Sequence, residues 1–280
     1  MPLASLYLIS LQPSTPLSSF VTLLHTSLPG TPQSQPLLIA RPIRWIIDPW
    51  IHLPTSAQAA ELEALTLVQW DIFLILPTLT DPLPAQLLQH VRTLYSLRVG
   101  IPSKIAADFK TRNMDLLHPA PNSIPELTGS LEKVQVSPTS KDLKLTAEIS
   151  QWLASPTTPK TAPCMLNFLS FHPGKQESYK AYGQAFASDV GIRRGGIAKI
   201  VGSVLRKDSK KEECLWDEIA VAHYPTVWHF ADMVASEDYQ EVNARYRVGA
   251  IRGTAILCCN ELDQDILKSV EAVTGDKSKI

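Results

Sequence analysis

The chain lacks long apolar runs, and it has almost no net charge. No apolar stretch reaches the roughly eighteen residues that mark a membrane-spanning helix. The formal net charge is only −1, so a broad basic surface for nucleic acid or anionic lipid is not expected. No basic residue precedes the first apolar stretch, which argues against a secretory signal. These absences predict a cytoplasmic protein with neither nucleic-acid nor membrane partners.

Cysteine is scarce and is not spaced for metal binding. The four cysteines all lie in the second half, at positions 164, 214, 258 and 259, and no CxxC pair exists. Cys258 and Cys259 are adjacent, so in a strand they point to opposite faces and would not hold one metal together. Buried, reduced thiols are therefore expected, and no metal site is predicted. Glycine-rich phosphate-binding motifs of the GxGxxG or Walker type are also missing.

Proline is nearly absent from the second half. Of the 22 prolines, only Pro173 and Pro225 follow Pro163, so the first half contains many more loops and edge positions. Residues 119–163 are expected to form a proline-rich connector with a short helix between residues 140 and 153. This connector divides the chain into residues 1–118 and residues 164–280.

One short sequence motif occurs in both halves of the chain. Residues 70–78 read Trp-Asp, then an apolar stretch, then Pro-Thr, and residues 216–226 repeat this arrangement with two additional residues. Because side chains alternate along a strand, two extra residues keep the same faces in register. A repeat at such long spacing indicates two copies of one domain and not a solenoid.

The pattern of elements in each half is strand, helix, strand, strand, helix, strand. This order is the ferredoxin-like split βαβ arrangement. In the second half we expect strands at 164–171, 196–205, 215–224 and 254–259, helices at 175–190 and from 226 to 246, and a last helix at 262–273. In the first half we expect strands at 6–11, 37–47, 70–76 and 100–109, with helices at 16–27 and 84–97.

Four motifs of the second half, taken in order, resemble the dimeric α+β barrel superfamily and, within it, a family of small proteins of unknown function. They are residues 165–171, Tyr179-Lys180-Ala181-Tyr182-Gly183, Trp216-Asp217 leading to His223-Tyr224-Pro225, and residues 233–239; the match covers about 164–260. The resemblance implies an α+β fold class. Two ferredoxin-like βαββαβ units, the first degenerate, would pack sheet against sheet as a pseudo-dimeric α+β barrel within one chain.

The resemblance also implies a function. Members of the superfamily include cofactor-free monooxygenases, polyketide cyclases, lactone isomerases and haem-handling enzymes. We therefore expect a cofactor-independent enzyme of the cyclase, isomerase or monooxygenase type, with no cofactor, acting on an aromatic or polyketide-like small-molecule substrate of secondary metabolism. The alternative is a non-catalytic ligand-binding or protein-interaction module. The chain would be a monomer with an internal pseudo-dimer, or a homodimer.

Three residues at strand ends are the candidates for catalysis. A cyclase or isomerase needs a general base and a donor for the developing enolate oxygen. His172 ends the first strand of the second half, and His223 and Tyr224 end the third. Neighbouring residues of a strand face opposite ways, so only one of His223 and Tyr224 can reach a given cavity. The alternative for each histidine is a strand-end residue in contact with water.

Two polar residues stand out within the strands themselves. Asn167 interrupts an apolar strand, and a buried amide costs about 1–3 kcal/mol unless it is hydrogen-bonded. It would contact either a ligand or a backbone group. Glu218 shares a strand face with Trp216, two alanines and Tyr224, and the small alanines leave space for a cavity. Asp217, on the other face, is expected to be structural.

The remaining candidates flank the strands. Arg194, in the sequence Arg-Arg-Gly-Gly at the start of a strand, could hold a carboxylate or phenolate, or could lie in a solvated turn. Trp228 and His229 begin the helix after Pro225, where an aromatic ring could stack on a flat ligand. His229 as an axial haem ligand is a further alternative.

The last three residues resemble a peroxisomal address. Ser278-Lys279-Ile280 differs from the Ser-Lys-Leu signal in its final residue. The sequence thus predicts either a peroxisomal location or a chance polar tail on a cytoplasmic protein.

Overall fold

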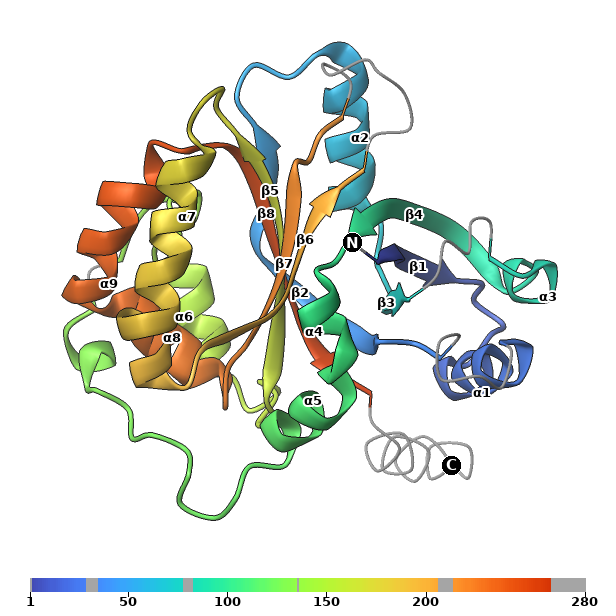
Figure 1. Cartoon of the computed structure of the whole chain (residues 1–280), viewed down its shortest axis with the longest axis horizontal. Coiled ribbons are helices and arrows are strands. Elements are labelled where there is room, and N and C mark those ends of the chain that lie inside the picture. Colours follow the sequence, from blue (N-terminus) through green and yellow to red (C-terminus); the bar gives the residue numbers. More distant parts are fainter. Residues whose placement is uncertain (1, 29–34, 78–82, 135, 206–213, 263–280) are drawn as a thin grey trace.

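In the part of the chain that the structure describes, eight strands form one closed antiparallel barrel in the order β1-β3-β2-β8-β5-β7-β6-β4 (Figure 1). The computed structural model describes residues 2–28, 35–77, 83–134, 136–205 and 214–262. The strands are β1 (Leu3–Leu11), β2 (Leu38–Ile51), β3 (Ile72–Leu76), β4 (Val91–Gly100), β5 (Pro163–Phe171), β6 (Ile197–Val204), β7 (Glu218–His223) and β8 (Ile251–Glu261).

The helices are arranged around the barrel (Figure 1). In the first half they are α1 (Leu17–Ser27), α2 (Ser56–Leu67), α3 (Ala85–Leu88), α4 (Ser103–Ala107) and α5 (Phe109–Leu117). A 3₁₀ turn (Ser130–Lys133) and α6 (Ala147–Leu153) follow, then α7 (Gln176–Ala185), α8 (Val227–Ala235) and α9 (Glu237–Val242). Two π-helical segments, Phe186–Val190 and Asn243–Val248, continue α7 and α9. Helices α6 to α9 form a layer over the outer face of β5–β8 (Figure 1).

The expected fold class, two ferredoxin-like βαββαβ units packed sheet against sheet as a pseudo-dimeric α+β barrel, is wrong. The structure instead has a single closed barrel, because β2 pairs with β8 and β4 pairs with β6. The prediction took into account only the bare face of each sheet. Closing all eight strands buries those faces in the interior and also pairs the edge strands, which would otherwise remain open.

Two elements of the first half also differ from the prediction. The expected helix 84–97 is only the short α3, and the expected strand 100–109 lies instead at β4, followed by α4 and α5. Short apolar runs do not distinguish helix from strand by periodicity alone. Here tertiary pairing decides, since β4 runs antiparallel to β1 along the whole length of β1.

Packed side chains fill the barrel interior. Alternate residues such as Leu166, Phe168, Ile219 and Val221 point inward and are fully buried. Phe168 contacts both Trp216 and Tyr95, with ring centroids 5.5 Å and 6.2 Å apart. An eight-stranded barrel is just wide enough for side chains to fill it. The barrel interior is therefore a packed hydrophobic core.

The repeated Trp-Asp pairs have the same role in both halves. Trp70 and Trp216 are buried in the barrel core. An oxygen of Asp71 accepts a hydrogen bond from the Leu11 backbone N–H at 2.7 Å. Asp217 accepts one from the Phe171 N–H at 2.9 Å. Each aspartate thus ties the approach to one strand to the end of its neighbour, which is the structural role expected for Asp217.

Within the described residues, no helix is long and apolar enough to span a bilayer. Three predicted features lie outside the described residues: a hairpin turn at residues 208–211, most of the helix 262–273, and the Ser278–Ile280 tail.

Candidate functional site

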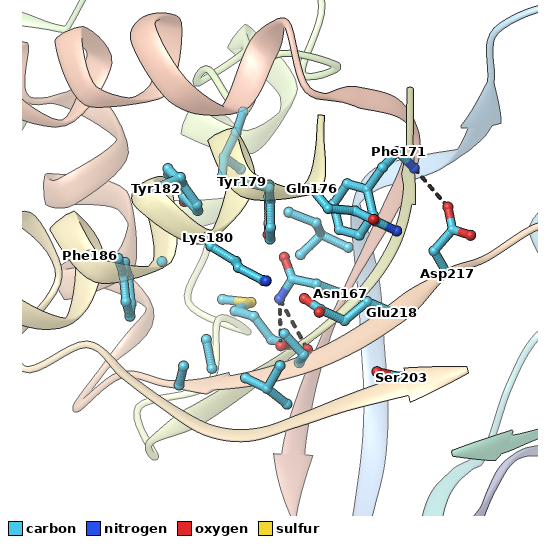
Figure 2. A pocket seen from close by; sticks show the side chains of 18 of the residues that line it. Asn167, Phe171, Gln176, Tyr179, Lys180, Tyr182, Phe186, Ser203, Asp217 and Glu218 are labelled. Atoms are coloured by element: carbon cyan, nitrogen blue, oxygen red, sulfur yellow. Dashed lines mark hydrogen bonds between the residues drawn. The ribbon is translucent and has the colours of Figure 1, made fainter. Parts of the chain in front are cut away.

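A cavity of about 440 Å³ lies between the outer face of β5–β8 and the layer formed by α7 and α8 (Figure 2). Its volume falls within the range of small-molecule sites, about 300–1,000 Å³. Most of its wall is apolar and aromatic, with a few polar groups. The aromatic residues are Phe171, Tyr179, Tyr182, Phe186, Tyr224 and Phe230, and the polar ones are Asn167, Gln176, Lys180, Ser203, Asp217 and Glu218.

Small side chains create this space. Ala220 and Ala222 point outward from β7 toward the helices and line the cavity. Gly183 lies opposite on α7, where an added Cβ would have no neighbouring atom within 4 Å. Large aromatic rings around these positions keep the helix away from the sheet. The alternation of β7 therefore opens the cavity beside Glu218, as the alanine spacing predicted.

Glu218 is the titratable group best suited to proton transfer in this cavity. Burial, reinforced by the negative charge of Asp217, raises its pKa to about 7, although Lys180 acts in the opposite direction. No residue in the described part of the chain donates a hydrogen bond to its carboxyl group. A carboxyl group with a pKa near neutrality both accepts and returns a proton efficiently at pH 7.

Asn167 lies next to Glu218 on the same face of the sheet. It is paired with Ala220, so Glu218, two residues away on β7, is its diagonal neighbour. The Asn167 Nδ2 group donates to the Met165 carbonyl oxygen at 2.9 Å and to the Ala220 carbonyl oxygen at 3.3 Å. Figure 2 shows the amide oxygen directed into the cavity, on the side of Tyr179 and Lys180.

Helix α7 provides the potential donors across the cavity. Burial raises the pKa of Tyr179, so its hydroxyl stays protonated and can donate a hydrogen bond. Lys180 is mostly exposed and bonds Glu177 at 2.6 Å. Arg247 is only 2% exposed and lacks an acidic partner among the described residues. Its positive charge offsets part of the rise that burial causes in the Tyr179 pKa. The hydroxyl groups of Tyr182 and Tyr239 are hydrogen-bonded to each other at 3.0 Å.

The three candidate catalytic residues are not brought together. Tyr224 lines the cavity with its ring, and its hydroxyl lies 3.7 Å from the Met233 sulfur. His223 faces away from the cavity and is buried; burial and the Lys199 charge lower its pKa to about 3, so it is neutral. His172 directly follows the far end of β5, and its ring centroid lies 6.3 Å from that of His52.

The other candidate binding residues serve mainly as structural contacts. Arg194 is buried and binds Asp232 at 3.3 Å and Asp238 at 3.1 Å. His229 uses both ring nitrogens, on the Thr226 hydroxyl at 2.8 Å and on the Pro125 carbonyl oxygen at 2.9 Å. Neither nitrogen is therefore available to a haem iron. Trp228 packs within the helix layer.

Trp216 does not share the face of Glu218. The expectation assumed that β7 begins before Trp216, but the strand starts at Glu218. A bend at Asp217 places Trp216 in the barrel core and leaves Asp217 at the cavity wall. Side-chain alternation holds only within the strand, so the prediction for Trp216 fails at the strand boundary.

The contribution of α7 to the cavity was not predicted from the sequence. Tyr179, Tyr182, Gly183 and Phe186 lie at helical spacing and all line the cavity. A glycine among aromatic residues on one helix face, opposite two alanines of a strand, was the available signal. Arg247 had no such signal, because its burial depends on the packing of its π-helix. No cluster of three or more metal-ligating side chains occurs in the described ranges.

Comparisons with known proteins add little about activity. No protein-family model matches the chain, and no curated protein matches it. A protein of unknown function from Rhodopseudomonas palustris is 24% identical, covering 43% of this chain and 97% of its own, with a TM-score of 0.36. A Fusobacterium nucleatum subsp. nucleatum protein, provisionally described as a monooxygenase, is 8% identical, covering 94% of this chain and 93% of its own, with a TM-score of 0.46. Likenesses this distant carry no argument about activity.

Proposed function

We propose that the protein is an enzyme that moves a proton within a flat, largely apolar small molecule, in an isomerisation or a cyclisation. Glu218 is the general base in this proposal. The observation that carries it is the position of this carboxyl group, with a pKa raised to about 7, in the wall of a 440 Å³ cavity lined by aromatic rings.

The reaction needs few groups. The Glu218 carboxylate removes a proton from the carbon next to a substrate carbonyl, leaving an enolate. The Tyr179 hydroxyl, held protonated by burial, donates a hydrogen bond to the enolate oxygen. Glu218 then returns its proton to a different carbon, which completes an isomerisation. Alternatively the enolate carbon attacks a second carbonyl, whose oxygen takes the proton, which completes a cyclisation.

A test of the base uses 2-tetralone, a flat aromatic ketone, as the probe. We expect the purified protein to accelerate exchange of its α-hydrogens for deuterium in D₂O, followed by proton NMR. Glu218→Gln should lower the accelerated rate at least about 100-fold, because general-base catalysis contributes 10²–10⁴-fold. Glu148→Gln, in an exposed pair with Arg44, is the matched control and should leave the rate unchanged. An unchanged rate in Glu218→Gln would contradict the role of Glu218.

A second variant tests the cavity. Gly183→Leu places a side chain in the open space on α7, and leucine favours a helix more than glycine by about 1 kcal/mol. We expect the variant to remain folded by circular dichroism and to lose both probe binding and exchange. Binding that is retained by Gly183→Leu would place the probe elsewhere. Binding of the probe to the unaltered protein without any exchange would indicate a non-catalytic binding protein.

A further inference from the structure

The orientation of the Asn167 amide is fixed by its surroundings. Both neighbours of its nitrogen, the carbonyl oxygens of Met165 and Ala220, can only accept hydrogen bonds. Turning the amide over would place its own oxygen against two other oxygens. The nitrogen must therefore face the strands, and the oxygen must face the cavity.

The sheet side of the cavity consequently presents acceptors. No described residue donates to the Asn167 Oδ1 atom, and none donates to the Glu218 carboxyl group beside it. An acceptor that a ligand covers without replacing its water costs about 1–3 kcal/mol. A purely apolar ligand would impose this cost at Asn167, whereas a ligand with a hydroxyl group would avoid it.

We infer that Asn167 selects ligands carrying a hydroxyl group on the edge of their flat ring, which donates to its Oδ1 atom. This inference names the ligand class for the cavity of the proposed function and rests on that cavity, but it does not depend on proton transfer. An asparagine with a purely structural role would hold the two carbonyl groups equally well and show no preference between ligands.

The experiment compares 2-naphthol with 2-methoxynaphthalene, which lacks the donor. Dissociation constants are measured by calorimetry at pH 7 for the unaltered protein, for Asn167→Leu and for Gln184→Leu. The last is a matched amide-to-leucine control on the exposed side of α7. We expect the unaltered protein and Gln184→Leu to prefer 2-naphthol about tenfold, the value of one net hydrogen bond. In Asn167→Leu the ratio should fall to near one.

The failures of the two proposals are distinguishable. If both probes bind the unaltered protein equally, the inference about Asn167 is overturned while the proposed function stands. A preference that persists in Asn167→Leu belongs to Glu218 or another group and also overturns it. If neither probe binds, the flat-ligand cavity itself is refuted. The comparison in the unaltered protein decides the matter even if Asn167→Leu fails to fold.

Discussion

At the scale of single residues, burial determines the charge of the groups that matter most. Glu218 and His223 both follow Trp216 and belong to the same strand, β7. Nevertheless, the pKa of Glu218 is raised to about 7, whereas that of His223 is lowered to about 3. Both shifts follow from desolvation, which disfavours the charged form of either group. The cavity thus holds a titrating acid, while the barrel core holds a neutral histidine.

The pH dependence of stability tests the Glu218 pKa directly. Its folded pKa of about 7 exceeds the ordinary value of 4.5, so the folded protein holds a proton that the unfolded chain has already lost between those pH values. Glu218 therefore lowers stability progressively as the pH rises from 4.5 to 7, by up to about 3 kcal/mol.

Glu218→Gln should remove this cost. We expect its gain in unfolding free energy to be near zero at pH 4 and up to about 3 kcal/mol at pH 8, measured by urea denaturation at each pH. Glu148→Gln should show no such trend. A gain that is constant with pH would mean that Glu218 titrates at its ordinary value.

At the scale of elements, buried charge anchors the connector to the helix layer. Asp232 of α8 is fully buried and accepts hydrogen bonds from the Thr128 N–H at 3.0 Å, the Thr128 hydroxyl at 2.6 Å and the Ser130 N–H at 2.9 Å. It also pairs with the buried Arg194 guanidinium. One carboxylate thus fixes the chain before the Ser130–Lys133 turn and the arginine that precedes β6.

We expect Asp232→Ala to destabilise the protein by about 3–5 kcal/mol, because it removes the acceptor of the Thr128 and Ser130 hydrogen bonds and one of the two carboxylate partners of the buried Arg194. The connector should also become more susceptible to limited proteolysis near residues 125–134. Asp189→Ala, which removes an exposed pair with Arg193, should cost less than about 1 kcal/mol. Equal effects of the two variants on stability and cleavage would refute the anchoring role.

At the scale of the whole molecule, a buried polar triangle joins the two halves at one end of the barrel. Lys199 of β6 binds Glu261 of β8 and the Asn113 side chain of α5, the latter at 2.8 Å, and Asn113 donates to Glu261 at 2.6 Å. All three side chains are at least nine-tenths buried. A buried ion pair is weak grounds for net stability, but losing one partner is costly.

We therefore expect Lys199→Met alone to lower the unfolding free energy by about 3–5 kcal/mol. Adding Glu261→Leu should recover most of this loss, because no unpaired charge remains buried. Arg112→Met, which breaks an exposed pair with Asp108, should change stability by less than about 1 kcal/mol. Chemical denaturation of the three variants measures these differences. A double variant as unstable as Lys199→Met would show that the ion pair itself is strongly stabilising.

Local pattern predicted most of the second half, including the strand face of Glu218, Ala220 and Ala222 that lines the cavity. The first half was harder because its short apolar segments suit helix and strand equally, and pairing between β1 and β4 decided the outcome. For Asn167, the sequence left open a structural bond or a cavity contact. In the structure the amide does both: its nitrogen donates to a backbone carbonyl oxygen, and its oxygen faces the cavity (Figure 2).

By itself, the sequence determined what alternation along a strand can encode: which residues share a face, and where small side chains leave room. It also determined the structural role of Asp217, the acid of the second Trp-Asp pair, because a strand entry is a local feature. Only the tertiary structure decided that the eight described strands close into one barrel, that α7 lines the cavity opposite the sheet, and that His223 is buried away from it. These outcomes depend on pairing between distant strands and on burial, and no local pattern encodes either.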